Sequence, residues 1–242
     1  MQKTTQILRF IDLDFIKKGF HINYEILLGI HMKNKFLILI LTATIAYGAT
    51  SSDRGAYYYH KKSQFEMLAQ NNKYKTVMLG DSITDGGLWN ELLNNDLIQN
   101  RGIAGDTTDG VLERLDSINT NIEKVFIMIG INDIFQEKSV EYIFINYKKI
   151  IEILKTKNIK VYIQSTLYVG HNKPEIYNQK VEQLNKLLKE YCQKNNLEYV
   201  NLNEILAPNK VLKEEFSYDK LHLNGTAYSL WRDKIKDYFL EH

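Results

Sequence analysis

The sequence predicts an α/β fold, a three-layer α/β/α sandwich around a five-stranded parallel sheet. Three observations carry this prediction. Short apolar runs alternate with long amphipathic segments from about residue 57 to the C-terminus, glycines stop two of these runs, and the only prolines are Pro174 and Pro208. Such runs are typical of strands buried on both faces, and right-handed crossovers place the helices between them on both sides of the sheet. Ligands of such folds bind outside the carboxyl ends of the strands.

The expected strands are residues 75–79, 97–100, 124–129, 160–164 and 197–200. The first and third stop at Gly80 and Gly130, and a glycine after a short apolar run marks the end of a buried strand. Helices are expected at residues 57–70, at 139–157, from Pro174 onward and at 226–240.

The helices show apolar stripes at helical spacing. These stripes comprise Ile143, Tyr147, Ile150 and Leu154 in the second helix, Tyr177, Val181, Leu184, Leu188 and Tyr191 in the third, and Trp231, Ile235, Tyr238 and Phe239 in the last. Apolar residues three and four positions apart face one side of a helix. Cys192 extends the stripe of the third helix, so we interpret it as a core residue.

The composition excludes several classes of protein. Hydrophobic residues make up 44% of the 242 residues and charged residues 25%, which is the balance of a globular domain rather than of a disordered or multi-pass membrane chain. Cys192 is the only cysteine, which excludes an intrachain disulfide and a cysteine-built zinc site. The net charge of +2 gives no electrostatic reason to expect nucleic acid as a partner.

Residues 1–48 are expected to precede the folded domain, which we place at residues 49–242. Residues 32–48 have the pattern of a secretory signal peptide, with lysines at the start, an apolar run at 36–46 and the small residues Ala46 and Gly48 at the −3 and −1 positions of a cleavage site. The run is shorter than the roughly 20 residues of a membrane-spanning helix. The expected location is therefore periplasmic or secreted, without a stable membrane span after cleavage. A buried core segment and a retained single N-terminal anchor are the alternatives, and residues 1–31 are interpreted as an upstream extension.

A serine follows the first expected strand, within GDSIT at residues 80–84. A serine on a sharp turn beside a glycine has the exposed hydroxyl that a nucleophile needs, because its base must approach from the side. The same position suits a serine that only caps the next helix. Both interpretations of Ser82 stay open at this point.

The loops after the second and third strands carry candidate hydrogen-bond donors. NRGIAGDTT at residues 100–108 contains Gly102 and Gly105, and GIND at residues 130–133 places the amide of Asn132 at a strand end. Backbone and amide donors aimed at one point form an oxyanion hole. The alternatives are a helix-start loop with a capping threonine for the first motif and a turn-forming asparagine for the second.

A histidine with an acidic neighbour lies near the C-terminus, in DKLHLN at residues 219–224. The carboxylate of Asp219, three residues before His222, can accept a hydrogen bond from one ring nitrogen and leave the other free to take a proton. An ordinary surface histidine is the alternative.

Together the four motifs resemble those of the SGNH hydrolases, also called the GDSL-like lipase/esterase family, and of its bacterial acetylhydrolase-like branch. They occur in the family's order and with similar spacing, from about residue 75 to the C-terminus. The resemblance implies a five-stranded sheet in a flavodoxin-like order. Ile131 departs from the family, in which threonine or glycine is frequent at this position, but the change removes no catalytic group.

The resemblance implies a role for each matching residue. Ser82 matches the nucleophile, His222 the base and Asp219 the acid that orients the base. The oxyanion hole is expected from the backbone N–H groups of Ser82 and Gly105 and from the side chain of Asn132, with Gly102 as the second glycine candidate. No metal and no cofactor are expected.

The predicted function is hydrolysis of a carboxylic ester through an acyl-serine, with a small-molecule or glycan ester as substrate. A short-chain or carbohydrate O-acetylesterase is the first choice, and a lysophospholipase or thioesterase of the same family is the second. The complete set of site residues disfavours a non-catalytic carbohydrate-binding module of the same fold.

A phosphatase or metal hydrolase that uses Asp81, Asp85 and Asp133 is a further alternative. It is disfavoured because no histidine or further carboxylate stands at ligand spacing. We expect Asp81 and Asp133 to stabilise their loops by hydrogen bonding. The stretch at residues 85–89, beside the nucleophile, either shapes the acyl pocket, or its Leu88 and Trp89 begin a packed helix.

Overall fold

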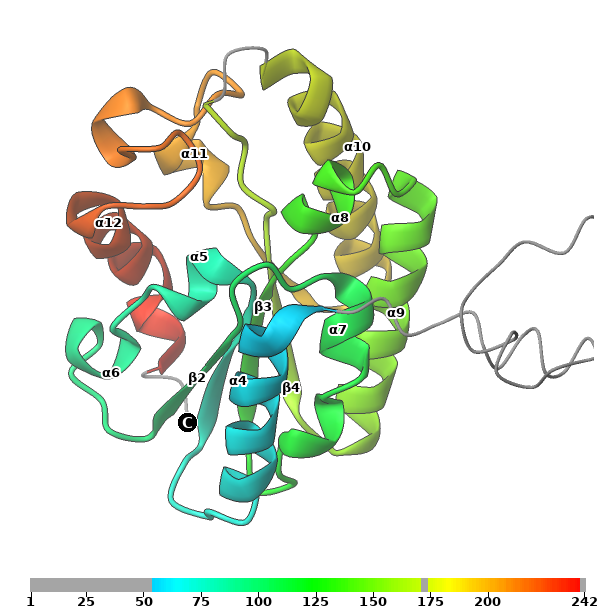
Figure 1. Cartoon of the computed structure of the whole chain (residues 1–242), viewed down its shortest axis with the longest axis vertical. Coiled ribbons are helices and arrows are strands. Elements are labelled where there is room, and N and C mark those ends of the chain that lie inside the picture. The colour runs from blue at the N-terminus through cyan, green and yellow to red at the C-terminus, as the bar shows by residue number, and fades with distance from the viewer. Residues whose placement is uncertain (1–53, 171–173, 240–242) are drawn as a thin grey trace, which may run out of the picture. The chain divides into compact units, whose positions relative to one another are not determined.

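The computed structural model describes residues 54–170 and 174–239, so the expected leader at residues 1–48 lies outside the described part. The strands are β1 (Thr76–Gly80), β2 (Ile98–Gly102), β3 (Lys124–Met128), β4 (Lys160–Gln164) and β5 (Glu198–Val200). They form a five-stranded sheet in the order β2-β1-β3-β4-β5, and every neighbouring pair is parallel (Figure 1). The predicted fold class and the implied strand order are confirmed.

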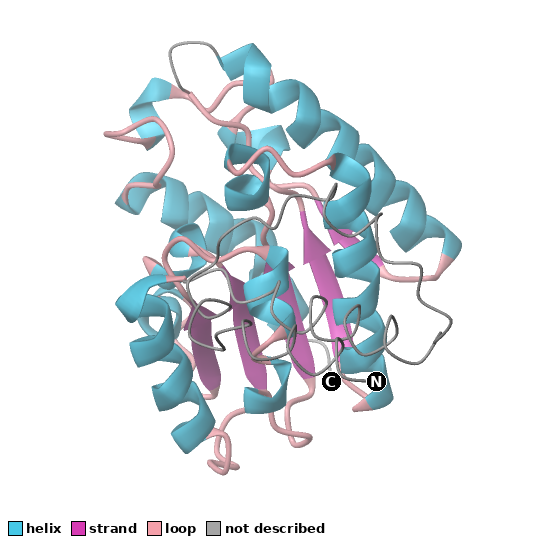
Figure 2. Cartoon of the chain, turned by 45° about the vertical axis from the view of Figure 1, so that its right-hand side comes forward, coloured by secondary structure: helices cyan, strands magenta, loops and turns pink. Residues whose placement is uncertain are grey.

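Helices cover both faces of the sheet (Figure 2). One face carries α4 (Gly55–Leu68), α7 (Thr108–Leu112), α9 (Val140–Thr156) and α10 (Pro174–Lys194), and the other carries α6 (Trp89–Leu92) and α12 (Gly225–Ile235). Short helices follow the strands: α5 (Ser82–Asp85), α8 (Ile131–Phe135) and α11 (Asn203–Leu206), with 3-10 turns η3 (Leu115–Ser117), η4 (Glu214–Phe216) and η5 (Lys236–Phe239). No helix in the described ranges is long and apolar enough to cross a membrane.

The two long helices bury most of the stripes that the sequence predicts, although Tyr177 and Tyr191 in α10 are only partly buried. The side chain of Ser139 caps α9 by accepting a hydrogen bond from the N–H of Tyr142 at 3.2 Å. The buried residues of α9 include Ile143, Tyr147, Ile150 and Leu154, and those of α10 include Val181, Leu184, Leu188 and Cys192. Cys192 is 1% exposed, so its interpretation as a core residue is confirmed, and this burial raises the pKa of its thiol to about 12.

The second strand is longer than predicted. Its register with β1 continues to the pair Gly80 and Gly102, so Arg101 and Gly102 belong to β2 and not to the following loop. The hydrogen-bond ladder of a parallel pair extends as long as both backbones stay extended, which the apolar pattern alone does not reveal.

The last helix is shorter than predicted. It ends at Ile235, and the chain continues as the 3-10 turn η5 up to Phe239. Trp231 and Ile235 are fully buried, and the ring of Phe239 stacks on Phe126 with 5.0 Å between centroids. The predicted inward face of this segment is therefore correct, although the α-helix becomes a 3-10 helix after Ile235.

Candidate active site

Ser82 follows β1 and is the first residue of α5. Asp81, the residue before it, is the N-cap, and its Oδ1 accepts a hydrogen bond from the N–H of Ile83 at 3.0 Å. An N-cap side chain satisfies one of the free N–H groups of the first turn. Since Asp81 supplies the cap, the hydroxyl of Ser82 is left for other contacts, and the capping interpretation of Ser82 is wrong.

The hydroxyl of Ser82 lies next to an imidazole that a carboxylate holds. Nε2 of His222 is 2.9 Å from Oγ of Ser82, although the two residues are 140 positions apart, and Nδ1 of His222 is 2.6 Å from Oδ2 of Asp219. An imidazole that donates from Nδ1 to a carboxylate keeps Nε2 as an acceptor. The structure therefore brings together the three residues that the sequence proposes as nucleophile, base and orienting acid.

Asp219 also holds the loop around the imidazole. Its Oδ1 accepts hydrogen bonds from the backbone N–H groups of Leu221 at 3.0 Å and His222 at 2.7 Å, and from the hydroxyl of Ser217 at 3.2 Å. Partial burial opposes ionisation, but the hydrogen bonds from His222 and Leu221 outweigh it and hold the pKa of Asp219 below its usual range. Asp219 is therefore a carboxylate at neutral pH. The side chains of His222 and Asp219 are 46% and 54% exposed, which leaves this edge of the sheet open to solvent.

The two candidate glycines differ in the use of their N–H groups. The N–H of Gly102 donates to Oδ1 of Asn100 at 2.8 Å. Gly105 is the third residue of a turn that Asp106 closes by donating to the carbonyl of Ile103 at 3.1 Å, and its φ of +76° is one that glycine adopts without strain. Gly105 is exposed, and its N–H has no acceptor among the described residues. The geometry favours Gly105 as the oxyanion donor.

Asn132 lies in α8, beside the turn that contains Gly105. Its Nδ2 donates to the backbone carbonyl of Asp106 at 2.9 Å, and the second N–H of the amide remains for a ligand. The buried carboxylate of Asp133 accepts from the backbone N–H of Thr108 at 2.9 Å and from its hydroxyl at 2.7 Å. These bonds join α8 to α7 and hold Asn132 at the Gly105 turn. The expectation that Asp133 stabilises its loop is confirmed.

A family model described as the GDSL-like lipase/acylhydrolase family matches residues 78–230. This range covers more than half of the chain and includes Ser82, Gly105, Asn132, Asp219 and His222. The chain belongs to the GDSL-like lipase/acylhydrolase family.

Several known proteins are similar to this family member. A protein of Streptococcus agalactiae serotype III, named N-acylneuraminate cytidylyltransferase, is 28% identical over 174 residues, which are 69% of this chain and 40% of that protein. The chain thus spans well under half of the length of that relative. A structure described as a candidate platelet activating factor from Streptococcus pneumonia has a TM-score of 0.69 at 24% identity and covers 85% of this chain and 99% of its own. A GDSL-like lipase from Bacteroides thetaiotaomicron has a TM-score of 0.66 at 26% identity, and the match covers 76% of this chain and 97% of that structure.

In this GDSL-like protein the turn that bears Ser82 packs closely on the strand ends. A Cβ atom at Gly102 would collide with the backbone of Asp85 in α5. The side-chain amide of Asn100 donates to the carbonyls of Thr84, Asp85 and Gly87 at 3.1, 2.9 and 3.0 Å. A bare backbone at Gly102 and one amide of β2 therefore fix the position of α5. Asn100 stands in the second sequence motif, but its role becomes visible only in the structure.

Asp81 is a deeply buried carboxyl next to Ser82. Its side chain is 1% exposed, and burial raises its pKa to about 7, although the N–H of Ile83 opposes the shift. The nearby carboxyls of Asp106 and Asp133 raise it further. The cap before Ser82 therefore changes charge near neutral pH.

The three carboxylates of the metal-hydrolase alternative are engaged separately. Asp81 and Asp133 accept the bonds described above, and Asp85 accepts from Lys61 at 2.8 Å and from the hydroxyl of Tyr57 at 2.7 Å. Within residues 54–170 and 174–239, no group of three histidine, cysteine, aspartate or glutamate side chains is placed to hold a metal ion.

Trp89 packs in the core instead of lining the site. It is 1% exposed, its indole N–H donates to the carbonyl of Thr84 at 2.9 Å, and its ring meets those of Tyr228 and Trp231 edge to face. Of the two interpretations that the sequence left open, the packed helix is correct for Trp89, whereas Leu88, the N-cap of α6, is 65% exposed.

Proposed function

We propose that the chain is a serine esterase that hydrolyses short-chain carboxylic esters, with O-acetylated carbohydrates as the substrate class. One observation carries the proposal: Ser82, His222 and Asp219 lie in a hydrogen-bonded line, with 2.9 Å between Oγ and Nε2 and 2.6 Å between Nδ1 and Oδ2. A serine hydroxyl is a weak nucleophile by itself and is activated by such an oriented base.

In acylation, Oγ of Ser82 attacks the ester carbonyl carbon while Nε2 of His222 takes the hydroxyl proton. The carbonyl oxygen becomes an oxyanion, and the backbone N–H groups of Ser82 and Gly105 and the free amide N–H of Asn132 are its donors. The bond to the alkoxy group then breaks, and His222 gives the proton to the leaving alcohol. Asp219 keeps the imidazole in the correct tautomer and stabilises its cationic form.

In deacylation, a water molecule attacks the acyl carbon and gives a proton to His222. The bond between the acyl carbon and Oγ breaks, the proton returns to Ser82, and the carboxylic acid leaves. The same oxyanion donors serve both steps because both pass through a tetrahedral intermediate.

The substrate class is inferred from the openness of the site and from the relatives. His222 and Asp219 are about half exposed, which suits an ester on the surface of a bulky molecule such as a glycan. The Streptococcus agalactiae relative is named for an N-acylneuraminate, an acylated sugar. A lysophospholipase or thioesterase of the same family is the second candidate.

We also propose that residues 32–48 direct export and that residues 49–242 are the mature enzyme in the periplasm or outside the cell. Residues 1–48 contain six Lys and Arg and three Asp and Glu, so their removal changes the net charge from +2 to −1. N-terminal sequencing of the exported protein tests this part: a new terminus near residue 49 is expected, and a retained Met1 in the exported form contradicts it.

The test of the function is a series of p-nitrophenyl esters of increasing acyl length, followed by acetate release from O-acetylated sialic acid, xylan and peptidoglycan. We expect kcat/KM to be highest for acetate and at least one glycan to release acetate. A maximum at long acyl chains favours the lipid or thioester alternative.

The matched variants for this test are Ser82→Ala and Ser63→Ala. The hydroxyl of Ser63 donates to the carbonyl of His60 on the exposed side of α4, so its loss should leave turnover unchanged. Ser82→Ala should abolish hydrolysis, and undiminished turnover by this variant contradicts the proposal.

A further inference from the structure

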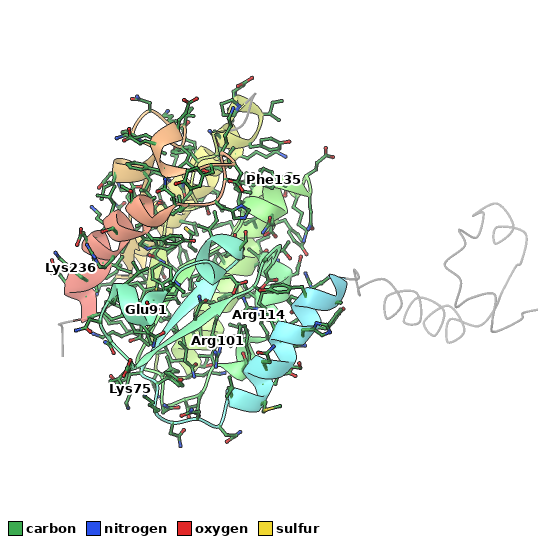
Figure 3. All side chains as sticks on the ribbon, turned by 60° about the vertical axis from the view of Figure 1, so that its left-hand side comes forward. Lys75, Glu91, Arg101, Arg114, Phe135 and Lys236 are labelled. Atoms are coloured by element: carbon green, nitrogen blue, oxygen red, sulfur yellow. The ribbon has the colours of Figure 1, made fainter. Side chains whose placement is uncertain are left out.

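Arg114 is a buried cation that is bonded to both halves of the candidate site. It follows α7, lies next to α4 (Figure 3) and is 2% exposed. Nε donates to Oδ2 of Asp106 at 2.8 Å, Nη1 to the carbonyl of Arg101 at 2.9 Å and Nη2 to the carbonyl of Gly80 at 3.0 Å.

The three acceptors lie in different segments of the chain around the site, and that of Arg101 is a backbone carbonyl. Gly80 ends β1 and stands two residues before Ser82, and Arg101 lies near the end of β2. Asp106 follows Gly105, and its backbone carbonyl holds the amide of Asn132 at 2.9 Å. One guanidinium group therefore joins the end of β1, which precedes Ser82, to the turn that contains Gly105 and accepts from Asn132.

A guanidinium is suited to this task because its N–H groups point in several directions within one plane. The ammonium of a lysine offers its donors from a single atom and cannot reach three separated acceptors in the same way. The ion pair with Asp106 is almost fully excluded from water, with side-chain exposures of 1% and 0%. A buried ion pair of this kind is sensitive to the loss of either partner.

Arg101 is a neighbouring arginine without these bonds to the site. It is 4% exposed, and its guanidinium lies 4.5 Å from the ring centroid of Phe65, while that of Arg114 lies 5.8 Å from the same centroid. Its Nε and Nη2 have no hydrogen-bond partner among the described residues, and Nη1 reaches only the carbonyl of Asn100 at 3.3 Å. Since Arg114 contacts the backbone of Arg101, a change of the Arg101 side chain leaves that bond in place.

We propose that Arg114 is a positioning residue that sets the spacing between Ser82 and the oxyanion donors Gly105 and Asn132. It does not contact the substrate, and the inference rests on the proposed esterase function. Donors stabilise an oxyanion only where they lie within hydrogen-bond distance of the oxygen that develops charge. A shift of the Gly105 turn relative to Ser82 therefore weakens binding of the transition state more than binding of the ester. Replacement of Arg114 should therefore lower kcat and leave KM nearly unchanged.

The experiment measures kcat and KM for p-nitrophenyl acetate in the wild type, Arg114→Lys and Arg101→Lys. Active sites are counted by complete reaction with a fluorophosphonate, so that unfolded molecules do not enter kcat. We expect Arg114→Lys to lower kcat per site about 10–100-fold with KM within about threefold, because small misplacements of reacting groups have effects of this size. Arg101→Lys should stay within about threefold of the wild type in both constants.

Several results overturn the inference. A wild-type kcat per site in Arg114→Lys contradicts it. An equally large fall in kcat per site in Arg101→Lys also contradicts it, because any buried cation would then have the same effect. A lower melting temperature with unchanged kcat per site assigns Arg114 a purely structural role. A wild type that is inactive on all esters overturns the proposed function and this inference with it, whereas an active wild type with an unaffected Arg114→Lys overturns the inference alone.

A second variant covers the case in which Arg114→Lys does not fold. Arg114→Met combined with Asp106→Asn removes both charges together and leaves no unpaired buried ion, which proteins tolerate better than the loss of one partner. The backbone carbonyl of Asp106 still accepts from Asn132. We expect the same fall in kcat per site, and wild-type kcat in the double variant contradicts the role of Arg114.

Discussion

Single residues of the candidate site are oriented by contacts that leave their reactive groups free. Asn132 uses one amide N–H for the carbonyl of Asp106, and His222 uses Nδ1 for Asp219. The other N–H of Asn132 and Nε2 of His222 then point in directions set by the protein and not by the substrate. Groups held in this way need no reorganisation when charge develops in the transition state.

Removal of the Asn132 amide should weaken the oxyanion hole without abolishing the reaction. We expect Asn132→Ala to lower kcat for p-nitrophenyl acetate by about 10²–10³, the usual effect of one lost donor. Asn195→Ala is the control, because the Asn195 amide donates to the carbonyl of Tyr191 on an exposed surface at the end of α10. A kcat of Asn132→Ala equal to that of the control contradicts the role of Asn132.

The buried cap before Ser82 should make stability depend on pH. Burial raises the pKa of Asp81 to about 7 in the folded protein, against about 3.9 in the unfolded chain. The folded state therefore binds more protons between these values, and stability falls as pH rises through this window. Asp81→Asn keeps an acceptor for the N–H of Ile83 and removes the charge.

We expect Asp81→Asn to be more stable than the wild type at pH 8, on the order of 2–4 kcal/mol, and to approach it near pH 4. Urea unfolding at both pH values measures the difference. A gain that is the same at pH 4 and pH 8 would show that the charge of Asp81 is not its cause.

Among the elements, α4 lies outside the residues that match the family model yet is bonded to the site. Lys61 and Tyr57 hold the carboxylate of Asp85 at the end of α5, and the hydroxyl of Tyr58 donates to the carbonyl of Gly110 in α7 at 2.8 Å. The hydrogen bond to Asp85 raises the pKa of Tyr57 to about 12. The helix thus supports both the nucleophile turn and the helix after the Gly105 turn.

The bond from α4 to Asp85 should contribute measurably to stability. We expect Lys61→Met to lower the free energy of unfolding by about 1–2 kcal/mol, because Lys61 and Asp85 form a partly buried charged hydrogen bond. Lys62→Met is the control: its partner Glu66 is 3.7 Å away and more than half exposed, and such pairs contribute about 0–1 kcal/mol. Equal urea midpoints for the two variants would contradict the role of α4.

The sequence predicts elements well where a local rule applies. The strands at Gly80 and Gly130 are close to their observed bounds, because a glycine after an apolar run marks the strand end. The short helices α5 and α8 follow from contacts made in the folded chain, so no apolar stripe predicts them, and the stripe that continues into η5 does not show that the helix there is 3-10. In the site, the sequence motifs identify Ser82 and His222, but residues that act through contacts in the folded chain have no such motif.

Arg114 shows why some site residues escape sequence analysis. Within VLERLDS an arginine resembles a solvated residue of an amphipathic segment. It is buried only because the ends of β1 and β2 and the turn at Asp106 meet around it. No spacing along the chain encodes that meeting point, which is a property of the strand order.

The whole molecule assembles the site through the order of its strands. Since β2, β1 and β3 are neighbours and parallel, the segments after them, with Gly105, Ser82 and Asn132, leave the same edge of the sheet. The loop after β5 and η4 adds Asp219 and His222. Residues far apart in the chain therefore meet without any local signal that links them.

A chain of residues 49–242 should contain everything that the fold needs. The described residues, 54–170 and 174–239, form one compact unit, and α4 belongs to it. We expect this chain to unfold in a single cooperative transition, and a chain that begins at residue 75 to be clearly less stable because it lacks α4. Equal melting temperatures for the two chains would contradict this division.

The central claim is that Ser82 is the nucleophile of a serine hydrolase, and covalent labelling tests it most directly. The protein is incubated with a fluorophosphonate, and its intact mass and the modified peptide are measured by mass spectrometry for the wild type and Ser82→Ala. The wild type should gain one phosphonyl group on Ser82, and Ser82→Ala should gain none. An unlabelled wild type, or equal labelling of both proteins, would contradict the claim.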